Sequence, residues 1–572
     1  MRTNALKTFF ILTAIYLAVS CANPVTPSGG PKDTVPPEFI KSEPAMYSRN
    51  FTEDQIKITF DEFIQLKNLN EQVIISPPLT VQPEIKLKGK SVVIKLKEKL
   101  KENTTYNFFF GNAIVDLTEN NPIENFQFII STGDIIDSLS IEGQVTNAFD
   151  LTPAKGVNIG LYTPDNDTVP FDSLPYLVKP YYLTKTDEKG IFSLKNLSDQ
   201  QYKLFALIDL NSNMVFDQPT ESIAFVDSLV SPWFPNKSEP DTSAIDSIEL
   251  KKPLPQLSAE KKIKLSLFLE TDSTQRLMKV VVPKNYLVNI IFKRPVADLK
   301  IQPINLDTEI NWSIIEYNHT RDTISLWVTD TEKDSLWFVV NDNKTINDTL
   351  KVGLQKKVKG KKSATDMEKW KKIDFKSSIK SSSIELNKPL VFSFGYPITK
   401  IDTSRILLFE NDTIPVYPAI SFSDSSSRIL SIDYRWKQSM SYRLFIRDST
   451  ITNIHHAVND TIDIEFRSKS VEDYGNLYIQ FKPARPGVNH IVQLLSGDKV
   501  VLEKQVNSED RIAFNYLAPG KYNLKVIFDL NDNGLWDTGD YIYKIQPEEV
   551  LFFPSEINIR SNWDVEETWE LK

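Results

Sequence analysis

Short runs of alternating apolar and polar residues recur along most of the chain. In the first part they are clearest at residues 55–62, 91–96, 105–110 and 126–132, and Pro and Asn interrupt them. Alternation with a period of two predicts β-strands with one buried face, and many short strands separated by turn residues are typical of a β-sandwich. Long amphipathic helical patterns are hard to find. We therefore predict an all-β protein.

The same kind of pattern returns later in the chain. Residues 383–470 look like a second copy of the first sandwich, and residues 260–355 look like a weaker third copy. A sharper repeat relates residues 202–213 (YKLFALIDLNSN) to residues 522–533 (YNLKVIFDLNDN) at a constant offset of 320. If the first type of module is called A and the second B, the predicted order is A-B-A-A-B.

We expect five β-sandwich modules and the segments that join them. Their predicted boundaries are 38–134, 138–229, 259–355, 373–470 and 473–572, preceded by segments 1–20 and 21–37 and separated by linkers 230–258 and 356–372. The first linker is rich in Pro and Ser. The second holds eight lysines against Asp366 and Glu368, so it is either a solvated basic loop or a contact for an anionic surface.

Two resemblances support this interpretation. The FDE motif at residues 60–62, the stretch 100–106 and the stretch 126–132 resemble strands of the bacterial Ig-like domain first described in S-layer proteins, over residues 36–133. The turn LAPGKY at residues 517–522 resembles that of the transthyretin-like or collagen-adhesin B-type sandwich. Together they imply a tandem array of Ig-like and transthyretin-like β-sandwich domains.

Residues 1–20 have the pattern of a lipoprotein signal peptide. An apolar run follows Arg2 and Lys7 and ends at Cys21, the only cysteine. That run is too short to span a bilayer, which takes about 20 residues, and small residues precede the cysteine. We predict cleavage before Cys21 and lipidation of its thiol, and a cleaved secretory signal with an incidental cysteine is the alternative. Residues 21–37 are rich in Pro and Gly and predict an extended tether.

Charge and composition narrow the range of partners. The formal net charge is -9 and the isoelectric point is near 5.3. Lys and Glu are interspersed over the predicted strands. Nucleic acid is not an expected partner, because phosphate binding needs a concentrated basic face. After Cys21 no second apolar segment approaches 18 residues, so the expected membrane contact is through lipid.

Residues 529–540 (DLNDNGLWDTGD) have the spacing of a calcium loop. Oxygen-bearing side chains stand at positions 1, 3, 5, 9 and 12, and the glycine at position 6 permits a sharp turn. The candidate calcium ligands are Asp529, Asn531, Asn533, Asp537 and Asp540. The alternative is a hairpin tip whose Asp and Asn side chains cap their own backbone without an ion.

The earlier repeat has a sister loop that matches this pattern less well. The matching residues are Asp209, Asn211, Asn213 and Asp217. Met214 stands at the glycine position and Thr220 at position 12, so calcium is expected less strongly there.

A tripeptide of Asp, then Ser or Thr, then an aliphatic residue or Thr recurs along the chain. It resembles the O-glycosylation site of exported Bacteroidota proteins. The alternative is structural, because Asp suits a turn and Thr with an aliphatic residue suits the start of a strand. The candidate glycosylation residues are Thr34, Ser138, Thr168, Ser173, Ser228, Thr323, Ser335, Thr349, Thr413 and Thr461.

The sequence contains no recognisable catalytic motif. The histidines His319, His455, His456 and His490 lack the spacing of a metal site, and there is no G-x-S-x-G elbow or catalytic cysteine. We therefore expect no enzymatic activity. Calcium is the one candidate cofactor.

The Pro-rich tether followed at once by the Ig-like domain resembles a family of Bacteroidota Ig-like-domain lipoproteins. This implies an outer-membrane protein held by lipid, facing either the periplasm or the cell surface. The expected function is a scaffold or adaptor, such as an accessory subunit of an outer-membrane barrel, assembly or secretion machine. A surface glycan-binding or adhesin protein is the alternative. It needs an exposed aromatic platform, for which Trp536 with Tyr541, or Trp233 with Phe234, are candidates.

Overall fold

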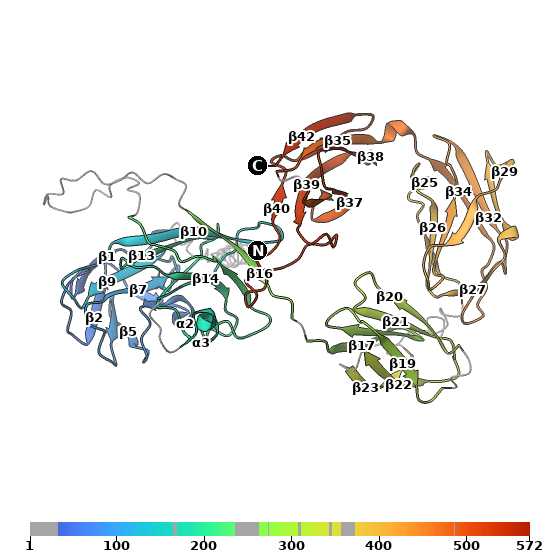
Figure 1. Ribbon diagram of the computed structural model, residues 1–572. Coiled ribbons are helices and arrows are strands. Elements are labelled where there is room, and N and C mark those ends of the chain that lie inside the picture. The colour runs from blue at the N-terminus through green and yellow to red at the C-terminus, as the bar shows by residue number, and fades with distance from the viewer. Residues whose placement is uncertain are drawn as a thin grey trace, which may run out of the picture. The chain divides into compact units, whose positions relative to one another are not determined.

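The computed structural model describes residues 33–163, 169–234, 262–272, 274–306, 311–342, 346–355, 372–484 and 487–571. In these residues nearly all regular structure is β-strand, as the alternation predicts (Figure 1). The short helical segments are α2 (Leu69–Gln72), η1 (Phe171–Ser173), α3 (Leu174–Leu177), η5 (Thr403–Arg405) and η6 (Val471–Asp473). The chain divides into two compact units, described here one at a time. Unit 1 is Met1–Glu270 with Gly539–Pro547, and unit 2 is Thr271–Thr538 with Glu548–Lys572.

Unit 1 begins with the first sandwich. Its strands are β1 (Phe39–Glu43), β2 (Gln55–Phe60), β3 (Ile64–Leu66), β4 (Ile74–Ser76), β5 (Glu84–Lys88), β6 (Ser91–Lys95), β7 (Thr105–Gly111), β8 (Ile114–Asp116) and β9 (Phe126–Ser131). One sheet has the order β1-β2-β6-β5, the other has the order β4-β7-β9, and β3 pairs with β8. Ile56, Ile58 and Phe60 on β2 are buried because successive side chains of a strand point to opposite faces.

The second module of unit 1 is built on a seven-stranded sheet. Its strands are β10 (Leu139–Asn147), β11 (Asn158–Tyr162), β12 (Tyr182–Lys185), β13 (Ile191–Leu197), β14 (Lys203–Ile208), β15 (Ser222–Phe225) and β16 (Ile263–Leu269). Their order in the sheet is β12-β11-β14-β15-β16-β10-β13. The core includes Ile141, Leu161 and Leu204, none of which is exposed.

Strand β16 corrects the expected boundary of the third module at residue 259. The strand pairs in parallel with β10, with Gly143 opposite Ile263, and antiparallel with β15. Its buried side chains Leu265 and Leu267 belong to the core of the second module. Residues 263–269 therefore complete the second sandwich, because their apolar face fills that core.

Unit 2 begins with the third and fourth modules. The third has β17 (Leu277–Lys284), β18 (Leu287–Phe292), β19 (Leu299–Pro303), β20 (Ser313–Tyr317), β21 (Thr323–Val328), β22 (Ser335–Asp342) and β23 (Ile346–Gly353). The fourth has β24 (Phe375–Ser377), β25 (Ser383–Ile384), β26 (Leu390–Phe394), β27 (Ile398–Ile401), β28 (Ile406–Glu410), β29 (Ile414–Val416), β30 (Ala419–Phe422), β31 (Ile429–Asp433), β32 (Ser441–Ile446), β33 (Ile451–Asn453) and β34 (Ile462–Ser468).

The three A modules share the topology of one four-stranded sheet. The sheet β1-β2-β6-β5 of the first corresponds to β17-β18-β21-β20 of the third and β24-β26-β31-β30 of the fourth. The pair β3–β8 recurs as β27–β33 in the fourth module, and the described residues of the third show no such pair. The first and fourth also share a hydrogen bond: the backbone N–H groups of Lys101 and Lys437 donate to the hydroxyls of Tyr106 and Tyr442, each at 2.9 Å.

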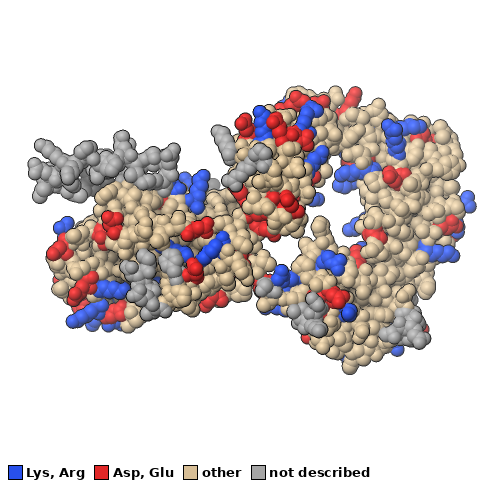
Figure 2. All heavy atoms as spheres, in the orientation of Figure 1, with Lys and Arg blue, Asp and Glu red and all other residues tan. Residues whose placement is uncertain are grey.

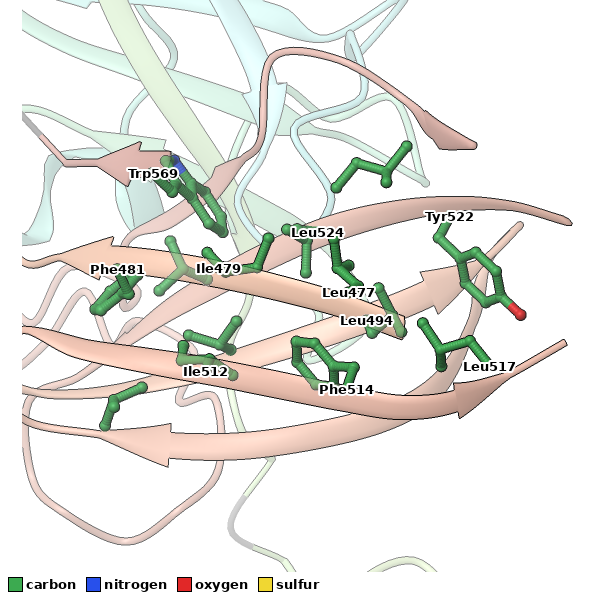
Figure 3. Close-up of a cluster of buried hydrophobic side chains, with 14 of the residues drawn as sticks. Leu477, Ile479, Phe481, Leu494, Ile512, Phe514, Leu517, Tyr522, Leu524 and Trp569 are labelled. Carbon is green, nitrogen blue, oxygen red and sulfur yellow. The ribbon is translucent and has the colours of Figure 1, made fainter. Parts of the chain in front are cut away.

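The fifth module completes unit 2 and repeats the topology of the second. Its strands are β35 (Gly475–Lys482), β36 (Asn489–Ser496), β37 (Lys499–Val506), β38 (Asp510–Leu517), β39 (Gly520–Asp529), β40 (Val550–Phe552), β41 (Ile557–Ile559) and β42 (Asp564–Glu570). Strand β35 pairs antiparallel with β38 and in parallel with β42, as β10 does with β13 and β16. Figure 3 shows its core, where Phe481, Phe514 and Trp569 come from different strands.

Both B modules carry the same tyrosine contact at the start of the strand that leads into the repeated loop. The hydroxyl of Tyr202 donates to the backbone oxygen of Ser198 at 3.0 Å, and that of Tyr522 donates to Ala518 at 2.8 Å. A tyrosine that bonds backbone a few residues upstream fixes a corner of many sandwiches. The sequence repeat at an offset of 320 is therefore a structural repeat.

Candidate functional site: two aspartate-rich hairpin loops

The predicted calcium loop follows β39 and begins at Asp529, whose side chain is only 1% exposed. One carboxylate oxygen of Asp529 accepts from the backbone N–H of Asn533 at 3.1 Å. The other accepts from the backbone N–H of Gly534 at 2.9 Å and from the side-chain amide of Asn489 at 2.9 Å. This carboxylate therefore caps the turn through hydrogen bonds of its own.

The two asparagines of the loop point their amide donors at one carboxylate. The side-chain amides of Asn531 and Asn533 both donate to Oδ2 of Asp537 at 2.6 Å. The side-chain oxygen of Asn531 accepts from the backbone of Asn533, and that of Asn533 accepts from the backbone of Leu535. The side chains of Asn531, Asn533 and Asp537 thus have hydrogen-bond partners within the hairpin.

The fifth predicted ligand is assigned to the other compact unit. Asp540 belongs to unit 1, whereas the other four predicted ligands belong to unit 2. The carboxylate of Asp540 accepts from the backbone N–H of Tyr543 at 3.1 Å. Among the described residues, no group of three or more His, Cys, Asp or Glu side chains is placed to hold a metal ion.

Calcium at this loop stays a prediction with a direct test. Calcium takes oxygen ligands, whereas the NH₂ groups of both asparagines now point at Asp537. Both amides would therefore have to rotate before their oxygens could bind an ion beside Asp537. Calorimetric titration of the full chain with calcium should be compared with that of the Asp537→Asn variant. Heat and a rise in Tm in the parent alone would establish the site, and their absence would leave a hydrogen-bonded hairpin.

The sister loop in the second module has the same hydrogen-bond pattern. The carboxylate of Asp209 accepts from the backbone N–H groups of Asn213 and Met214 at 3.2 and 2.8 Å. The side-chain amides of Asn211 and Asn213 donate to the two oxygens of Asp217 at 3.1 and 2.7 Å. The pattern forms without glycine, because Met214 itself adopts a φ of 66°.

A buried glutamate closes each loop, and the sequence analysis missed both. Glu221 is fully buried, and its carboxylate accepts from the backbone N–H groups of Leu210, Asp217 and Gln218 at 3.1, 3.1 and 3.2 Å. Charge-assisted bonds of this kind are about twice as strong as neutral ones. The glutamate therefore holds the first and last residues of the loop together.

Glu548 does the same in the fifth module. It accepts from the backbone N–H groups of Leu530 and Asp537 at 2.8 and 3.0 Å. Burial raises the pKa of Glu548, and the two backbone bonds oppose that rise. The two glutamates could not be matched in the sequence at the constant offset of 320, because Glu221 and Glu548 are 327 positions apart.

The predicted glycosylation sites that the structure describes are all exposed or half-buried. Six of the candidate glycosylation residues are exposed, namely Thr34, Ser138, Ser228, Thr349, Thr413 and Thr461, and three are half-buried, namely Ser173, Thr323 and Ser335. Thr168 and the predicted lipid site Cys21 lie outside the described residues. Glycosylation and lipidation stay predictions, and the intact mass of native protein tests both.

The surface carries charges of both signs. Figure 2 shows Lys and Arg interspersed with Asp and Glu over the visible face. In the part of the chain that the structure describes, no helix is long and apolar enough to cross a membrane.

The aromatic platform expected at Trp536 and Tyr541 is not formed. Trp536 is half-buried and donates its ring N–H to the backbone oxygen of Glu548 at 3.0 Å. Tyr541 is only 1% exposed. Trp233 packs against the second core, while Phe234 is exposed. The rings of Trp536, Tyr541 and Trp233 therefore serve packing, as most tryptophans do.

Unit 2 contains a charged junction between its third and fourth modules. Nη1 of Arg428 donates to both carboxylate oxygens of Glu316, at 2.9 and 2.8 Å. The buried Trp327 donates its ring N–H to the same carboxylate at 2.9 Å, and the guanidinium lies 4.6 Å from the centre of that ring. Because the side chains of Arg428 and Glu316 are about three-quarters buried, this pair is stronger than an exposed one.

Hydrogen bonds between uncharged groups also join other neighbouring modules within each unit. In unit 1 the hydroxyl of Ser76 accepts from the backbone N–H of Leu183 at 2.9 Å, so that β4 of the first module meets β12 of the second. In unit 2 the hydroxyl of Tyr474 accepts from the backbone N–H of Leu386 at 2.8 Å and links the fourth and fifth modules. These contacts fix neighbouring sandwiches through specific buried groups.

Two of the four histidines are buried. His455 lies 5.4 Å from the ring of Tyr286 and 5.2 Å from that of Tyr396, and burial, followed by the charge of His456, lowers its pKa to about 4. His490 has no exposed surface and lies between Phe481 and Phe528 in the fifth core.

Acidification should destabilise the fifth module through His490. Burial lowers its pKa, so between the ordinary value of 6.5 and that lower value the unfolded chain takes up a proton that the native state does not. The free energy of unfolding should therefore fall as the pH drops below about 6.5. Calorimetric melting of the His490→Leu variant should show a shallower fall than the parent. The exposed His319→Leu variant is the control, and an unchanged slope in His490→Leu would refute the assignment.

Comparison with known proteins adds a family for one module. The solved structures that this chain is similar to include the S-layer protein rSbsC, at 10% identity over 90% of this chain and 66% of that one, with a TM-score of 0.14. They also include BcpA, the major pilin subunit of Bacillus cereus, at 9% identity over 76% and 99%, with a TM-score of 0.13. A crystal structure of titin domains gives 8% identity over 50% and 97%, with a TM-score of 0.13. Scores this low carry no argument about function.

The sequence itself is matched over the first sandwich. Among curated proteins, none is significantly similar to this chain. Residues 33–131, which span β1 to β9, match the bacterial Ig-like domain family.

Proposed function

We propose that this chain is a non-enzymatic scaffold or adaptor, held at the bacterial outer membrane by lipid on Cys21 and seated on a membrane protein partner. The observation that carries the proposal is the set of buried junctions between neighbouring sandwiches, above all the one formed by Arg428, Glu316 and Trp327. Within each unit, sandwiches joined by such contacts hold their loops and edges at set spacings. That is what a scaffold needs in order to present several surfaces to one partner.

The exposed strand edges and loops supply the surfaces for such a partner. Edge strands present unpaired backbone groups, and extended partner segments can add to them. The bacterial Ig-like match of residues 33–131 is consistent with a protein of the cell surface. The lipid anchor and the tether of residues 21–37 would keep the first sandwich near the membrane.

The test is recovery of the partner from native membranes. Tagged full-length protein is purified from outer membranes in mild detergent, and co-purifying proteins are identified and quantified by mass spectrometry. We expect one membrane protein in near-equal amount. The Cys21→Ala variant should leave the membrane fraction and lose that partner. If the chain is present in the membranes but is purified without a partner, that result would contradict the adaptor proposal and favour glycan binding.

A further inference from the structure

The loop of the fifth module contains an insertion that its sister lacks. Asp217 and Glu221 stand four positions apart, whereas their counterparts Asp537 and Glu548 stand eleven apart. Both pairs make the same closing hydrogen bond, at 3.1 and 3.0 Å, so the added residues lie outside the hairpin pattern. They coincide with Gly539–Pro547, the segment that is part of unit 1.

Tyr541 of this segment lies in an aromatic pocket of unit 1. Its ring centre lies 5.1 Å from that of Phe225, 5.2 Å from that of Phe205 and 5.8 Å from that of Tyr176. Phe205 on β14 stands directly opposite Phe225 on β15. None of these rings belongs to the second module's own core. The pocket is therefore a second apolar surface on the outer side of the sheet.

Polar contacts surround the buried tyrosine. Its backbone N–H donates to a carboxylate oxygen of Glu270 at 2.7 Å. Nζ of Lys544 lies 2.6 Å from a carboxylate oxygen of Asp172, which also bonds Lys203 at 3.2 Å. The side-chain amide of Gln546 donates to a backbone oxygen of β15 at 3.2 Å. These contacts fix the direction of the segment. The ion pair with Asp172 favours a segment that has a lysine three positions after its tyrosine.

Two unpaired hydroxyl groups weaken the binding of this tyrosine. The hydroxyls of Tyr541 and Tyr176 are both buried and have no hydrogen-bond partner. A buried hydroxyl without a partner loses the hydrogen bonds that water would give it. Docking of the segment is therefore weaker than the burial of its ring alone would make it.

We propose that this pocket of the second module is a docking site for a tyrosine-bearing segment, that Gly539–Pro547 fills it reversibly, and that the same segment of a second copy of this chain can take its place. The chain carries both the pocket and its matching segment, and every copy offers an identical one. The unpaired hydroxyls keep the docking weak enough for exchange.

The test uses a full-length variant in which residues 540–546 are deleted. The deletion leaves Asp537 and Glu548 four positions apart, as in the sister loop, with a proline retained between them. The hairpin should therefore form normally while the pocket stands open. The probe is a synthetic peptide of residues 536–549, and calorimetry measures its binding to the deletion variant.

We expect the peptide to bind the deletion variant and not the parent at low concentration. A Tyr541→Phe peptide should bind about fivefold tighter or more, because it brings no unpaired hydroxyl. A Tyr541→Ala peptide should not bind. A Tyr543→Ala peptide is the matched control and should bind as the parent peptide does, because Tyr543 is 74% exposed.

Sedimentation tests the second copy. The parent chain should dimerise at high concentration, and the full-length Tyr541→Ala and deletion variants should not. Failure of the peptide to bind a deletion variant that melts like the parent would overturn the proposal. Weaker binding of the Tyr541→Phe peptide, or equal dimerisation of all three chains, would also overturn it.

Discussion

Replacement of Gly143 by alanine is expected to detach β16 from the second module and to lower the Tm of unit 1 sharply. Gly143 stands on β10 opposite Ile263, in the parallel pair. A Cβ at this position would lie 2.3 Å from the backbone oxygen of Ile263 and 2.6 Å from Cζ of Phe192. Neither a paired backbone nor a buried ring can retreat cheaply, so we expect a loss of roughly 3 kcal/mol.

Calorimetry and amide hydrogen exchange check this expectation. For a module of ordinary size, a loss of this magnitude corresponds to a Tm lower by roughly 10 °C or more. Gly353→Ala is the matched control, because the nearest atom to its added Cβ lies 4.0 Å away. A Gly143→Ala variant with the Tm of the control, and with protected amides in residues 263–269, would contradict the expected detachment of β16.

Replacement of Glu221 by alanine is expected to open the sister loop and to destabilise the second module by about 3 kcal/mol, because three backbone N–H groups lose a charged acceptor. Glu221→Gln keeps the shape and one oxygen, so its loss should be smaller. Chemical denaturation measures both variants.

The fifth module provides an internal comparison. Glu548 accepts from two backbone groups rather than three, so Glu548→Ala should cost less than Glu221→Ala. Glu188→Ala, at an exposed carboxylate of the second module, should change stability little. If Glu221→Ala and Glu188→Ala were equally stable, the buried glutamate would have no closing role.

The fold class follows from the sequence. Strict alternation, as in β2, identifies strands because one face is buried and the other is solvated. The repeat of residues 202–213 at 522–533 identifies the B modules, because the same strand and the same loop recur. The topology that the repeated modules share was not predictable in detail, because pairing between distant strands leaves no local pattern.

Strand β16 illustrates this limit. Residues 263–269 follow a long linker and precede the third module directly in the sequence. Their position along the chain therefore predicted that they belong to the third module. Their partners β10 and β15 lie far upstream, and a parallel pair needs a long crossover. The alternation of Leu265 and Leu267 predicts a strand, but not the core that it enters.

The candidate site was predicted in part. The spacing of four residues predicted that their side chains meet in one turn, and hydrogen bonds join them there: Asp529, Asn531, Asn533 and Asp537. The spacing did not reveal that Asn amide donors face Asp537, because side-chain rotation leaves no trace in sequence. Tyr541 at a predicted loop tip suggested an exposed ring, whereas the insertion that carries it packs into unit 1.

Neighbouring sandwiches of one unit should be held at a fixed distance by their junctions, and a distance measurement within unit 2 tests this. Cys21 is the only cysteine, so in a Cys21→Ala background the changes Lys300→Cys on β19 and Asp433→Cys on β31 create the only two thiols for spin labels. Pulsed electron resonance should give one narrow distance distribution, which should broaden in Arg428→Met. A broad distribution in the parent junction would contradict the claim.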